Sequence, residues 1–302
     1  MSSIRAALAE NGYVIQRQVL SGEELEALRG AASRTTERAR SGDWPDVRTV
    51  GKQFPPWPRP APGAPPKDGI WGVQGLLNPA LGPDAAVFAA SYFHDKVLDV
   101  AKALLTHEDD DEDEDEAATA ACKDEDLVLE LYNLLVRPES DFELEWHRDD
   151  VPRTATPEEE AAKLGIEEKK MKMKKKKKRY WNTQWNLPLA PPREPDMPGQ
   201  LVVRLEPGDV VFYDNNILHR GVYRADKERM SLHGSVGRAG GGRFRATNVL
   251  QHGVGKWVDG CDFSALADGP GGERSRRRAE GMRARLVELG RESGEVGFSL
   301  AG

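Results

Sequence analysis

The chain contains few cysteines, and this scarcity excludes two kinds of small-domain architecture. Only two occur in 302 residues, Cys122 and Cys261, and they form no C-x-x-C pattern. A disulfide framework or a cysteine-rich zinc site needs more thiols at closer spacing, so neither is expected. Scarce cysteine is also typical of proteins in reducing compartments, and we expect a cytoplasmic location.

Long apolar runs are missing as well. No stretch of about 18 apolar residues occurs, so the sequence predicts no transmembrane helix. The first residues, MSSIRAALAENGYVIQ, contain no extended apolar segment, and no signal peptide is expected. The ending SLAG differs from the peroxisomal S-K-L signal. We therefore expect no membrane partner.

Charge is abundant, and much of it lies in two runs of opposite sign. Charged residues make up 31% of the chain, and the net charge is −7. The runs are EDDDEDEDE at 108–116 and KKMKMKKKKKR at 169–179. Such runs lack the apolar side chains that would offset the entropy of ordering, so we expect insertions outside the core at about 106–125 and 165–179. No aromatic side chain separates the lysines, which favours a solvated insertion over a nucleic-acid site.

The N-terminal third predicts helices around one irregular segment. Residues 3–40 are typical of a helix, a short strand and a second helix, whose start is marked by the capping pair Ser21 and Glu24. Residues 43–83 are rich in Pro, Gly and Trp and predict a long loop, either over the mouth of a barrel or on its outer wall. Residues 84–105 have the apolar face of an amphipathic helix.

The rest of the chain predicts short strands at close spacing, closed by a helix over 279–289. The expected strands are 127–136, 142–147, 180–189, 201–205, 210–213, 217–223 and 229–236. Short strands separated by turn signals favour a sandwich or barrel, mainly β with flanking helices. The chain length suits a single domain over 1–302.

Two histidines and a carboxylate occur in strand contexts that suit a metal site. His147 and Asp149 are two residues apart, so they point to the same side of a strand, and His219 lies on another predicted strand. Two imidazoles and one carboxylate can bind one face of a non-haem Fe(II) and leave other positions open. Asp150 has the opposite parity and is the less favoured ligand. The alternative is a surface pair of His147 with Asp149 and a packed His219.

A cation follows the second histidine. Arg229 lies ten residues after His219, and its side chain shares a face of the predicted strand with Ser231. A guanidinium can hold a carboxylate by two parallel hydrogen bonds, and a hydroxyl can add a third donor. The alternative for Arg229 is a structural salt bridge with Glu228 or Asp226.

The order H-x-D, then H, then R-x-S resembles the Fe(II)/2-oxoglutarate-dependent dioxygenases, and most closely the phytanoyl-CoA dioxygenase (PhyH)-like family. The resemblance implies a double-stranded β-helix, the jelly roll of cupin-like proteins. It implies Fe(II) and 2-oxoglutarate as cofactors. The residues it assigns to the metal are His147, Asp149 and His219, and those it assigns to 2-oxoglutarate are Arg229, Ser231 and Trp185.

Some neighbouring residues have competing interpretations beside this family pattern. Arg220 and Arg224 lie too close to His219 for the spacing that the family uses. Trp185, in QWNL, matches an aromatic residue beside the co-substrate, although core packing is the alternative. His233 has the parity of a pocket-lining residue, although a hydrogen-bonded core histidine is more common.

The implied reaction oxidises, most simply hydroxylates, a C–H bond of a small or medium organic substrate. It consumes O2 and converts 2-oxoglutarate to succinate and CO2. The chain departs from the family after residue 189, where APPREPDMPG replaces a further strand and a P-G-S-H loop. One or two jelly-roll strands are therefore expected to be missing.

Two alternatives to this enzyme stay open. A catalytically weakened or non-catalytic barrel would bind a ligand without turnover, and the missing strands favour it. A metal-dependent isomerase or hydrolase of the cupin type would need no oxoacid, but it leaves Arg229 and Ser231 without a role.

Overall fold

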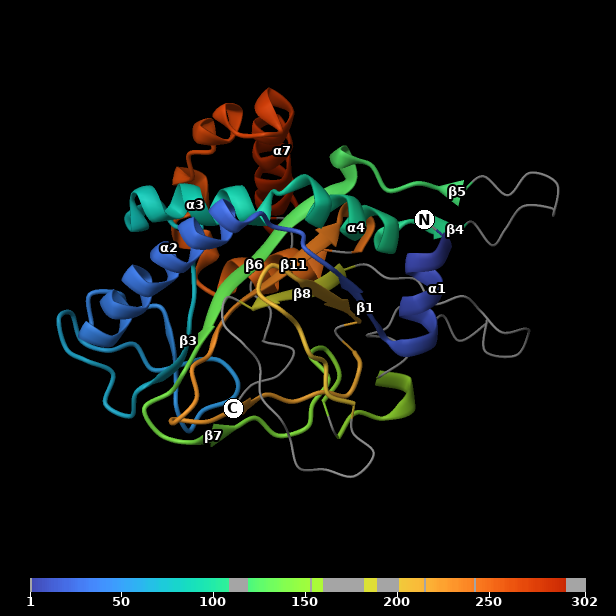
Figure 1. Cartoon of the computed structure of the whole chain (residues 1–302). Helices are drawn as coiled ribbons and strands as arrows, with labels where there is room; N and C mark the ends of the chain where they lie inside the picture. The colour runs from blue at the N-terminus through green and yellow to red at the C-terminus, as the bar shows by residue number, and fades with distance from the viewer. Residues whose placement is uncertain are drawn as a thin grey trace.

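The longest strand, β6 (Leu127–Val136), is an almost continuous apolar run that is buried along nearly its whole length. It belongs to an antiparallel sheet with the strand order β1-β9-β8-β11-β6-β3-β2 (Figure 1). The computed structural model describes residues 2–108, 119–152, 154–159, 182–188, 201–214, 216–241 and 243–291. The other strands of the sheet are β1 (Tyr13–Gln16), β2 (Val47–Thr49), β3 (Ile70–Val73), β8 (Asn182–Pro188), β9 (Val210–Tyr213) and β11 (Met230–Arg238).

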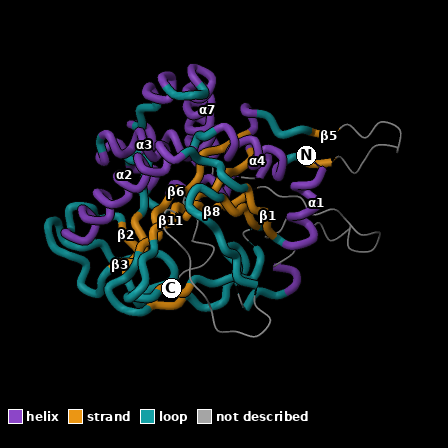
Figure 2. Tube along the Cα trace, in the orientation of Figure 1, coloured by secondary structure: helices purple, strands orange, loops and turns teal. Residues whose placement is uncertain are grey.

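Helices cover one face of this sheet, and loops with a second, smaller sheet lie on the other (Figure 2). The α-helices are α1 (Ser2–Asn11), α2 (Gly22–Ser41), α3 (Pro83–Tyr92), α4 (Asp95–Leu105), α6 (Arg243–Gln251) and α7 (Gly272–Arg291). Short 3-10 turns are η1 (Pro79–Leu81), η2 (Asp124–Asp126), η4 (Ala239–Gly241), η5 (Val254–Lys256), η6 (Val258–Gly260) and η7 (Ser264–Asp268). Among the described residues, no helix is both long and apolar enough to cross a membrane.

The start of α2 is the predicted capping box. The Ser21 hydroxyl accepts from the Glu24 backbone N–H, and the Glu24 carboxylate accepts from the Ser21 N–H at 2.7 Å. The single helix predicted over 84–105 is instead two helices, because the chain turns at Phe93 and His94. The His94 ring caps α4 by accepting from the Lys96 N–H at 3.2 Å.

Two strands come from the segment 43–83, which was predicted to be a loop. β2 and β3 pair with each other, and β3 pairs with β6, where Gly72 lies opposite Leu135. The prediction missed them because strands of three and four residues offer too little alternation to be recognised. The large sheet therefore ends in a segment that also reaches the pocket described below.

The smaller sheet is shorter than predicted. It pairs β7 (Phe142–Glu143) with β10 (Val222–Tyr223), where strands had been expected over 142–147 and 217–223. Residues 201–205, also expected to be a strand, have no regular structure. A separate two-stranded ladder joins β4 (His107–Glu108) to β5 (Thr119–Ala120).

The acidic segment expected over 106–125 is attached to the folded core at its C-terminal end. Cys122 is buried, and the Asp124 carboxylate accepts from Lys102 at 2.8 Å and from Arg274 at 3.1 Å. Packing against α4 and α7 thus begins within the range predicted to lie outside the core. Residues 109–118 and the lysine run 169–179 lie outside the described residues.

Two apolar clusters fix the layers. The larger joins the helices to the large sheet. The smaller consists of Trp71, Leu135 and Tyr223, with Phe142 and Leu144 packed against it. This smaller cluster therefore holds the large sheet against the β7–β10 pair.

Candidate metal centre and its pocket

The smaller sheet continues from β7 and β10 toward two histidines. The Leu144 N–H donates to the Gly221 carbonyl at 2.8 Å, and His147 and His219 then exchange two backbone hydrogen bonds of 3.0 Å. From the first pairing to the second, the chain advances three residues on one strand, from 144 to 147, but only two on the other, from 221 to 219. This difference of one residue is the pattern of a β-bulge. A shift of one residue exchanges the faces of a strand, so this irregularity places His219 opposite His147 and leaves Leu218 60% exposed.

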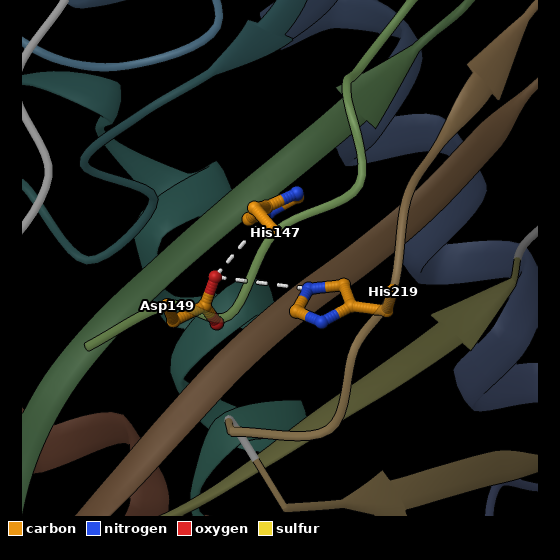
Figure 3. A group of neighbouring side chains, drawn as sticks. All are labelled: His147, Asp149 and His219. Atoms are coloured by element: carbon orange, nitrogen blue, oxygen red, sulfur yellow. Dashed lines mark ion pairs between the residues drawn. The ribbon is translucent and has the colours of Figure 1, made fainter. Parts of the chain in front are cut away.

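The structure brings the three predicted ligands together (Figure 3). One Asp149 carboxylate oxygen lies 3.4 Å from His147 Nε2 and 3.7 Å from His219 Nε2. All three candidate ligand atoms lie within 4.8 Å of one another. Atoms bound to one ion at about 2.1 Å can be at most about 4.2 Å apart, so both Asp149 distances suit a shared metal. The surface-pair alternative is wrong, because His219 faces the same carboxylate.

Backbone carbonyls orient both imidazole rings. His147 Nδ1 lies 2.8 Å from the Glu145 carbonyl, and His219 Nδ1 lies 2.8 Å from the Ile217 carbonyl. A carbonyl can only accept, so each Nδ1 carries a proton, and each Nε2 is the nitrogen that would offer its lone pair to a metal. Metal-binding histidines are commonly fixed through the ring nitrogen that does not bind the metal, and both rings have this arrangement.

A glutamine from the 43–83 segment holds the strand that carries His147. Gln53 accepts from the Glu145 N–H at 2.8 Å and donates to the Glu145 carbonyl at 3.2 Å. Its amide nitrogen also lies 3.1 Å from His147 Nδ1. The side chain therefore fixes the same carbonyl that orients the His147 ring. Sequence reasoning missed Gln53, since a single glutamine in a proline-rich segment carries no pattern.

Replacing Gln53 by alanine should weaken metal binding without unfolding the protein. Loss of groups that orient metal ligands typically lowers metal affinity by about 10- to 100-fold, and we expect the lower end because the Glu145 carbonyl remains. Titration with Co(II), followed by its visible absorption, measures the effect. Gln18→Ala, at a position away from the site, is the control. Equal affinities in Gln53→Ala and wild type would show that Gln53 does not position His147.

The charges around the centre favour an ionised carboxylate. Burial opposes ionisation of Asp149, but the hydrogen bond from His147 and the nearby His219 outweigh it and hold the pKa of Asp149 well below its usual range. Burial likewise opposes charge on His147, yet the bond to Asp149 leaves the pKa of His147 raised. The carboxylate therefore favours a proton on His147, and a cation bound at the same place would compete with that proton.

Arg229 faces the same pocket, and its predicted salt-bridge partners are engaged elsewhere. Glu228 lies 3.7 Å from Arg137, and Asp226 lies 3.3 Å from Lys227. The Arg229 guanidinium lies over the Tyr223 ring at 4.2 Å and donates to the Val222 carbonyl at 3.3 Å. Its Nε is buried without a hydrogen-bond partner. Within the described residues, no carboxylate is paired with this cation.

The rival arginines both have carboxylate partners, although Arg220 also lines the cavity. Arg220 pairs with Glu143 at 3.2 Å and lies over the Trp146 ring. Arg224 pairs with Asp141 at 3.1 Å. Geometry therefore selects Arg229 among the three arginines that follow His219.

The other predicted residues have mixed outcomes. Ser231 is buried beside Arg229 and its hydroxyl has no hydrogen-bond partner, although it does not line the cavity itself. His233 lines the cavity and its Nε2 lies 2.9 Å from the Tyr213 hydroxyl; burial lowers the pKa of His233 to about 3, which keeps it neutral. The Trp185 backbone lies in β8 opposite Gly234, and its side chain lies outside the described residues. These assignments stay predictions.

Asp150, the less favoured ligand, points away from the metal centre. Its carboxylate lies 3.6 Å from Arg245 and 3.5 Å from the Asn216 amide. Arg245 comes from α6, a helix that the sequence did not predict, and makes two hydrogen bonds of 3.0 and 2.8 Å with the buried Glu130. The two adjacent carboxylates therefore face different partners, although both residues lie in a bend after the His147–His219 bridge and not on a strand as predicted.

The triad and Arg229 share a cavity of about 190 Å³. Aromatic side chains, among them Phe54, Trp57, Trp71 and Tyr213, form part of its wall. Phe54 and Trp57 come from the segment 43–83, which supports the predicted position over the mouth rather than on the outer wall. This volume lies below the range of about 300–1,000 Å³ that is typical of ligand pockets, so it restricts an occupant to a small molecule.

Comparison with known proteins gives distant structural similarity only. No family model matches the sequence, and no curated protein sequence matches it. AviO1 from Streptomyces viridochromogenes Tue57 is 17% identical over 77% of this chain and 94% of that chain, with a TM-score of 0.46. EctD from S. alaskensis, solved with 2-oxoglutarate and 5-hydroxyectoine, is 15% identical over 80% and 77%, with a TM-score of 0.49. HygX from Streptomyces hygroscopicus, solved with nickel and 2-oxoglutarate, is 14% identical over 78% and 87%, with a TM-score of 0.46. Similarity at this level assigns no function, so membership of the PhyH-like family stays a prediction.

Proposed function

We propose that the chain is an Fe(II)- and 2-oxoglutarate-dependent oxygenase built on a double-stranded β-helix with a reduced second sheet. The observation that carries this proposal is one pocket with two features. It contains a His147–Asp149–His219 triad whose imidazoles are fixed through Nδ1, and it contains the guanidinium of Arg229, which has no carboxylate partner among the described residues.

The donor set fits the proposed metal. Two neutral imidazoles and one carboxylate are the ligands of non-haem Fe(II) oxygenases, and they leave positions open for other ligands. A tetrahedral structural zinc site would need a fourth protein ligand. The described residues show no fourth His, Cys or carboxylate within the group.

The second feature fits a dicarboxylate co-substrate. Arg229 Nε and the Ser231 hydroxyl are both buried without a hydrogen-bond partner. Leaving such groups unpaired is costly, so both are available to a ligand or to water. The distal carboxylate of 2-oxoglutarate would accept from both.

In this proposal iron supplies the activation of O2, with 2-oxoglutarate as the electron donor that becomes succinate and CO2. The residues of the chain would position the metal and the co-substrate and exclude water. His147, Asp149 and His219 would hold the ion, Arg229 and Ser231 would fix the co-substrate, and the aromatic wall would keep water from the oxidised C–H bond. The substrate is a small or medium organic molecule, most simply hydroxylated.

Anaerobic addition of Fe(II) and then 2-oxoglutarate tests the proposal directly. We expect a weak visible absorption band from the chelate, and we expect Asp149→Ala to abolish it by removing a ligand. Asp150→Ala is the matched control, since the neighbouring carboxylate faces Arg245 and should leave the band intact. Absence of the band in the wild type would contradict the proposal.

Succinate release in air then distinguishes turnover from binding. Succinate formed with a panel of organic substrates indicates an oxygenase. The band without succinate would favour the non-catalytic barrel, for which the short β7–β10 pair is the motivating observation. Turnover that is indifferent to 2-oxoglutarate would favour a metal-dependent isomerase or hydrolase.

A further inference from the structure

Besides Arg229, three arginines line the pocket. Arg220 and Arg245 are paired with Glu143 and Glu130, and Arg48 is the one that the proposed chemistry leaves without a role. Arg48 lies on β2, between the buried residues Val47 and Thr49, and its side chain lines the cavity with the metal triad. Among the described residues, no carboxylate is paired with Arg48, and its Nε is buried without a hydrogen-bond partner. An arginine stays protonated in proteins, so a full positive charge lies in this pocket.

Two indoles hold the Arg48 side chain in place. Its guanidinium carbon lies 5.0 Å from the Trp57 ring centre and 5.1 Å from the Trp71 ring centre. Both indole N–H groups donate to the carbonyl of Lys52, at 2.9 and 3.2 Å. One backbone carbonyl therefore fixes both rings, and the rings fix the cation by cation–π contact.

The opposite side of the Arg48 side chain is equally constrained. A Cβ added to Gly72, which lies opposite Arg48 in the sheet, would be 3.1 Å from Arg48 Cδ. Arg48 Nη2 lies 2.9 Å from the side-chain oxygen of the buried Asn133, in the amide orientation that satisfies both groups. A neutral amide oxygen accepts a hydrogen bond without neutralising the charge. The site thus orients a cation that has no ion-pair partner among the described residues, although the Asp149 carboxylate lines the same cavity.

A buried arginine with a purely structural role is usually paired with a carboxylate, and Arg48 has no such partner among the described residues. The other cavity arginine from the helical layer, Arg245, has the buried Glu130 as a bidentate partner. Burial lowers the pKa of Arg48, with Tyr223 and Asp149 acting in the opposite direction, which indicates a poorly solvated charge. A buried cation without a counter-charge costs free energy, unless an anionic ligand completes the site.

We propose that Arg48 binds a carboxylate of the substrate and places the rest of that molecule, along the aromatic wall, toward the His147–Asp149–His219 centre. The inference rests on the proposed function and names its substrate class, a small organic carboxylate distinct from 2-oxoglutarate. A carboxylate suits the site because it is planar and singly charged, as is one guanidinium. A phosphate ester would carry about two charges and would need further donors.

The surroundings of the two guanidiniums indicate which carboxylate each would bind. Arg229 is two residues from Ser231 in sequence, and the Ser231 hydroxyl, also buried without a hydrogen-bond partner, would supply an additional donor to a co-substrate carboxylate. Arg48 adjoins Trp57 and Trp71, which supply apolar surface for an organic body attached to the carboxylate. Each anion therefore has its own cation, and the two need not compete.

Ligand-observed NMR with three small probes tests the proposal. Benzoate carries the carboxylate, benzamide has the same shape without charge, and phenylphosphonate represents the phosphate class. Titrations use the full chain with Zn(II) and saturating 2-oxoglutarate, so that the metal and Arg229 are occupied. We expect benzoate to bind at least tenfold more tightly than benzamide or phenylphosphonate in the wild type.

Variants assign that preference to Arg48. Arg48→Gln should reduce benzoate affinity at least tenfold and leave benzamide affinity within about twofold, as expected when one charged hydrogen-bonding partner is removed. Arg48→Lys should recover part of the loss, because an ammonium retains the charge but not the planar fork. Asn133→Asp keeps Arg48 in place and supplies an internal carboxylate, so it should abolish the preference as well.

The outcomes separate this inference from the proposed function. Arg48→Gln should leave 2-oxoglutarate affinity, measured anaerobically with Fe(II), within about twofold of wild type. Loss of 2-oxoglutarate binding in Arg48→Gln would overturn the inference by making Arg48 the co-substrate anchor. Equal binding of benzoate and benzamide, or a preference for phenylphosphonate, would also overturn it. None of these results alters the test of the metal centre with Asp149→Ala.

Discussion

Arg229→Ala is expected to weaken 2-oxoglutarate binding by roughly 30-fold or more while Fe(II) binding changes little. Removing the partner of a buried carboxylate typically costs about 2–5 kcal/mol, because the remaining charge is left desolvated and unpaired. Arg229 has no ion-pair partner within the described residues, so its removal breaks no salt bridge among them. Titration of the iron-loaded protein with 2-oxoglutarate under argon measures the change.

The chain offers matched controls for this experiment. Arg224→Ala removes an arginine that is near in sequence but paired with Asp141 and lies outside the cavity lining, and it should leave the affinity unchanged. Arg229→Lys should recover only part of the loss, since an ammonium cannot make two parallel bonds to a carboxylate. Ser231→Ala should cost about 1 kcal/mol, as for one hydrogen bond. Unchanged affinity in Arg229→Ala would remove the main support for an oxoglutarate enzyme over a bare metal-binding protein.

The largest effect on stability is expected from Arg245→Ala. Its guanidinium makes two hydrogen bonds to Glu130, whose side chain is 1% exposed on β6. Burial alone would lower the pKa of Arg245, but Glu130 raises it, so Arg245 is charged in the folded protein. Removing one partner of a buried ion pair costs about 3–5 kcal/mol, because the other charge stays buried. We expect thermal denaturation to show a Tm lower by about 10 °C.

A double variant distinguishes loss of pairing from loss of packing. Glu130→Met combined with Arg245→Met removes both charges and keeps most of the volume, so most of the stability should return. Arg291→Ala removes an exposed pair with Asp259 and should leave the Tm almost unchanged. Equal destabilisation by the single and double variants would show that the side-chain stems, and not the charges, stabilise this layer.

Local patterns were sufficient for several elements. The Ser21–Glu24 capping box marked the start of α2, and the apolar run 127–136 predicted β6 with the bounds that the structure shows. Both depend on neighbours in sequence, namely a side chain that caps its own helix and a strand buried on both faces. Longer-range pairing could not be predicted in this way, and β2, β3 and α6 were missed for that reason.

The sequence by itself determined which residue types are available at the candidate site and which of them share a face. Parity along the predicted strand placed His147 with Asp149 and set Asp150 apart, because side-chain direction is a local property of an extended chain. The spacing of Arg229 and Ser231 after His219 was visible in the same way.

The tertiary structure alone decided which of these groups meet and which stay unpaired. A one-residue irregularity between the strands of the smaller sheet brings His219 to Asp149, and its register depends on pairing across about 70 residues of chain. Ion pairs remove Arg220 and Arg224 from consideration and leave Arg229. Arg48 comes from a segment about 100 residues before the triad, so only packing could show that its charge enters the same pocket.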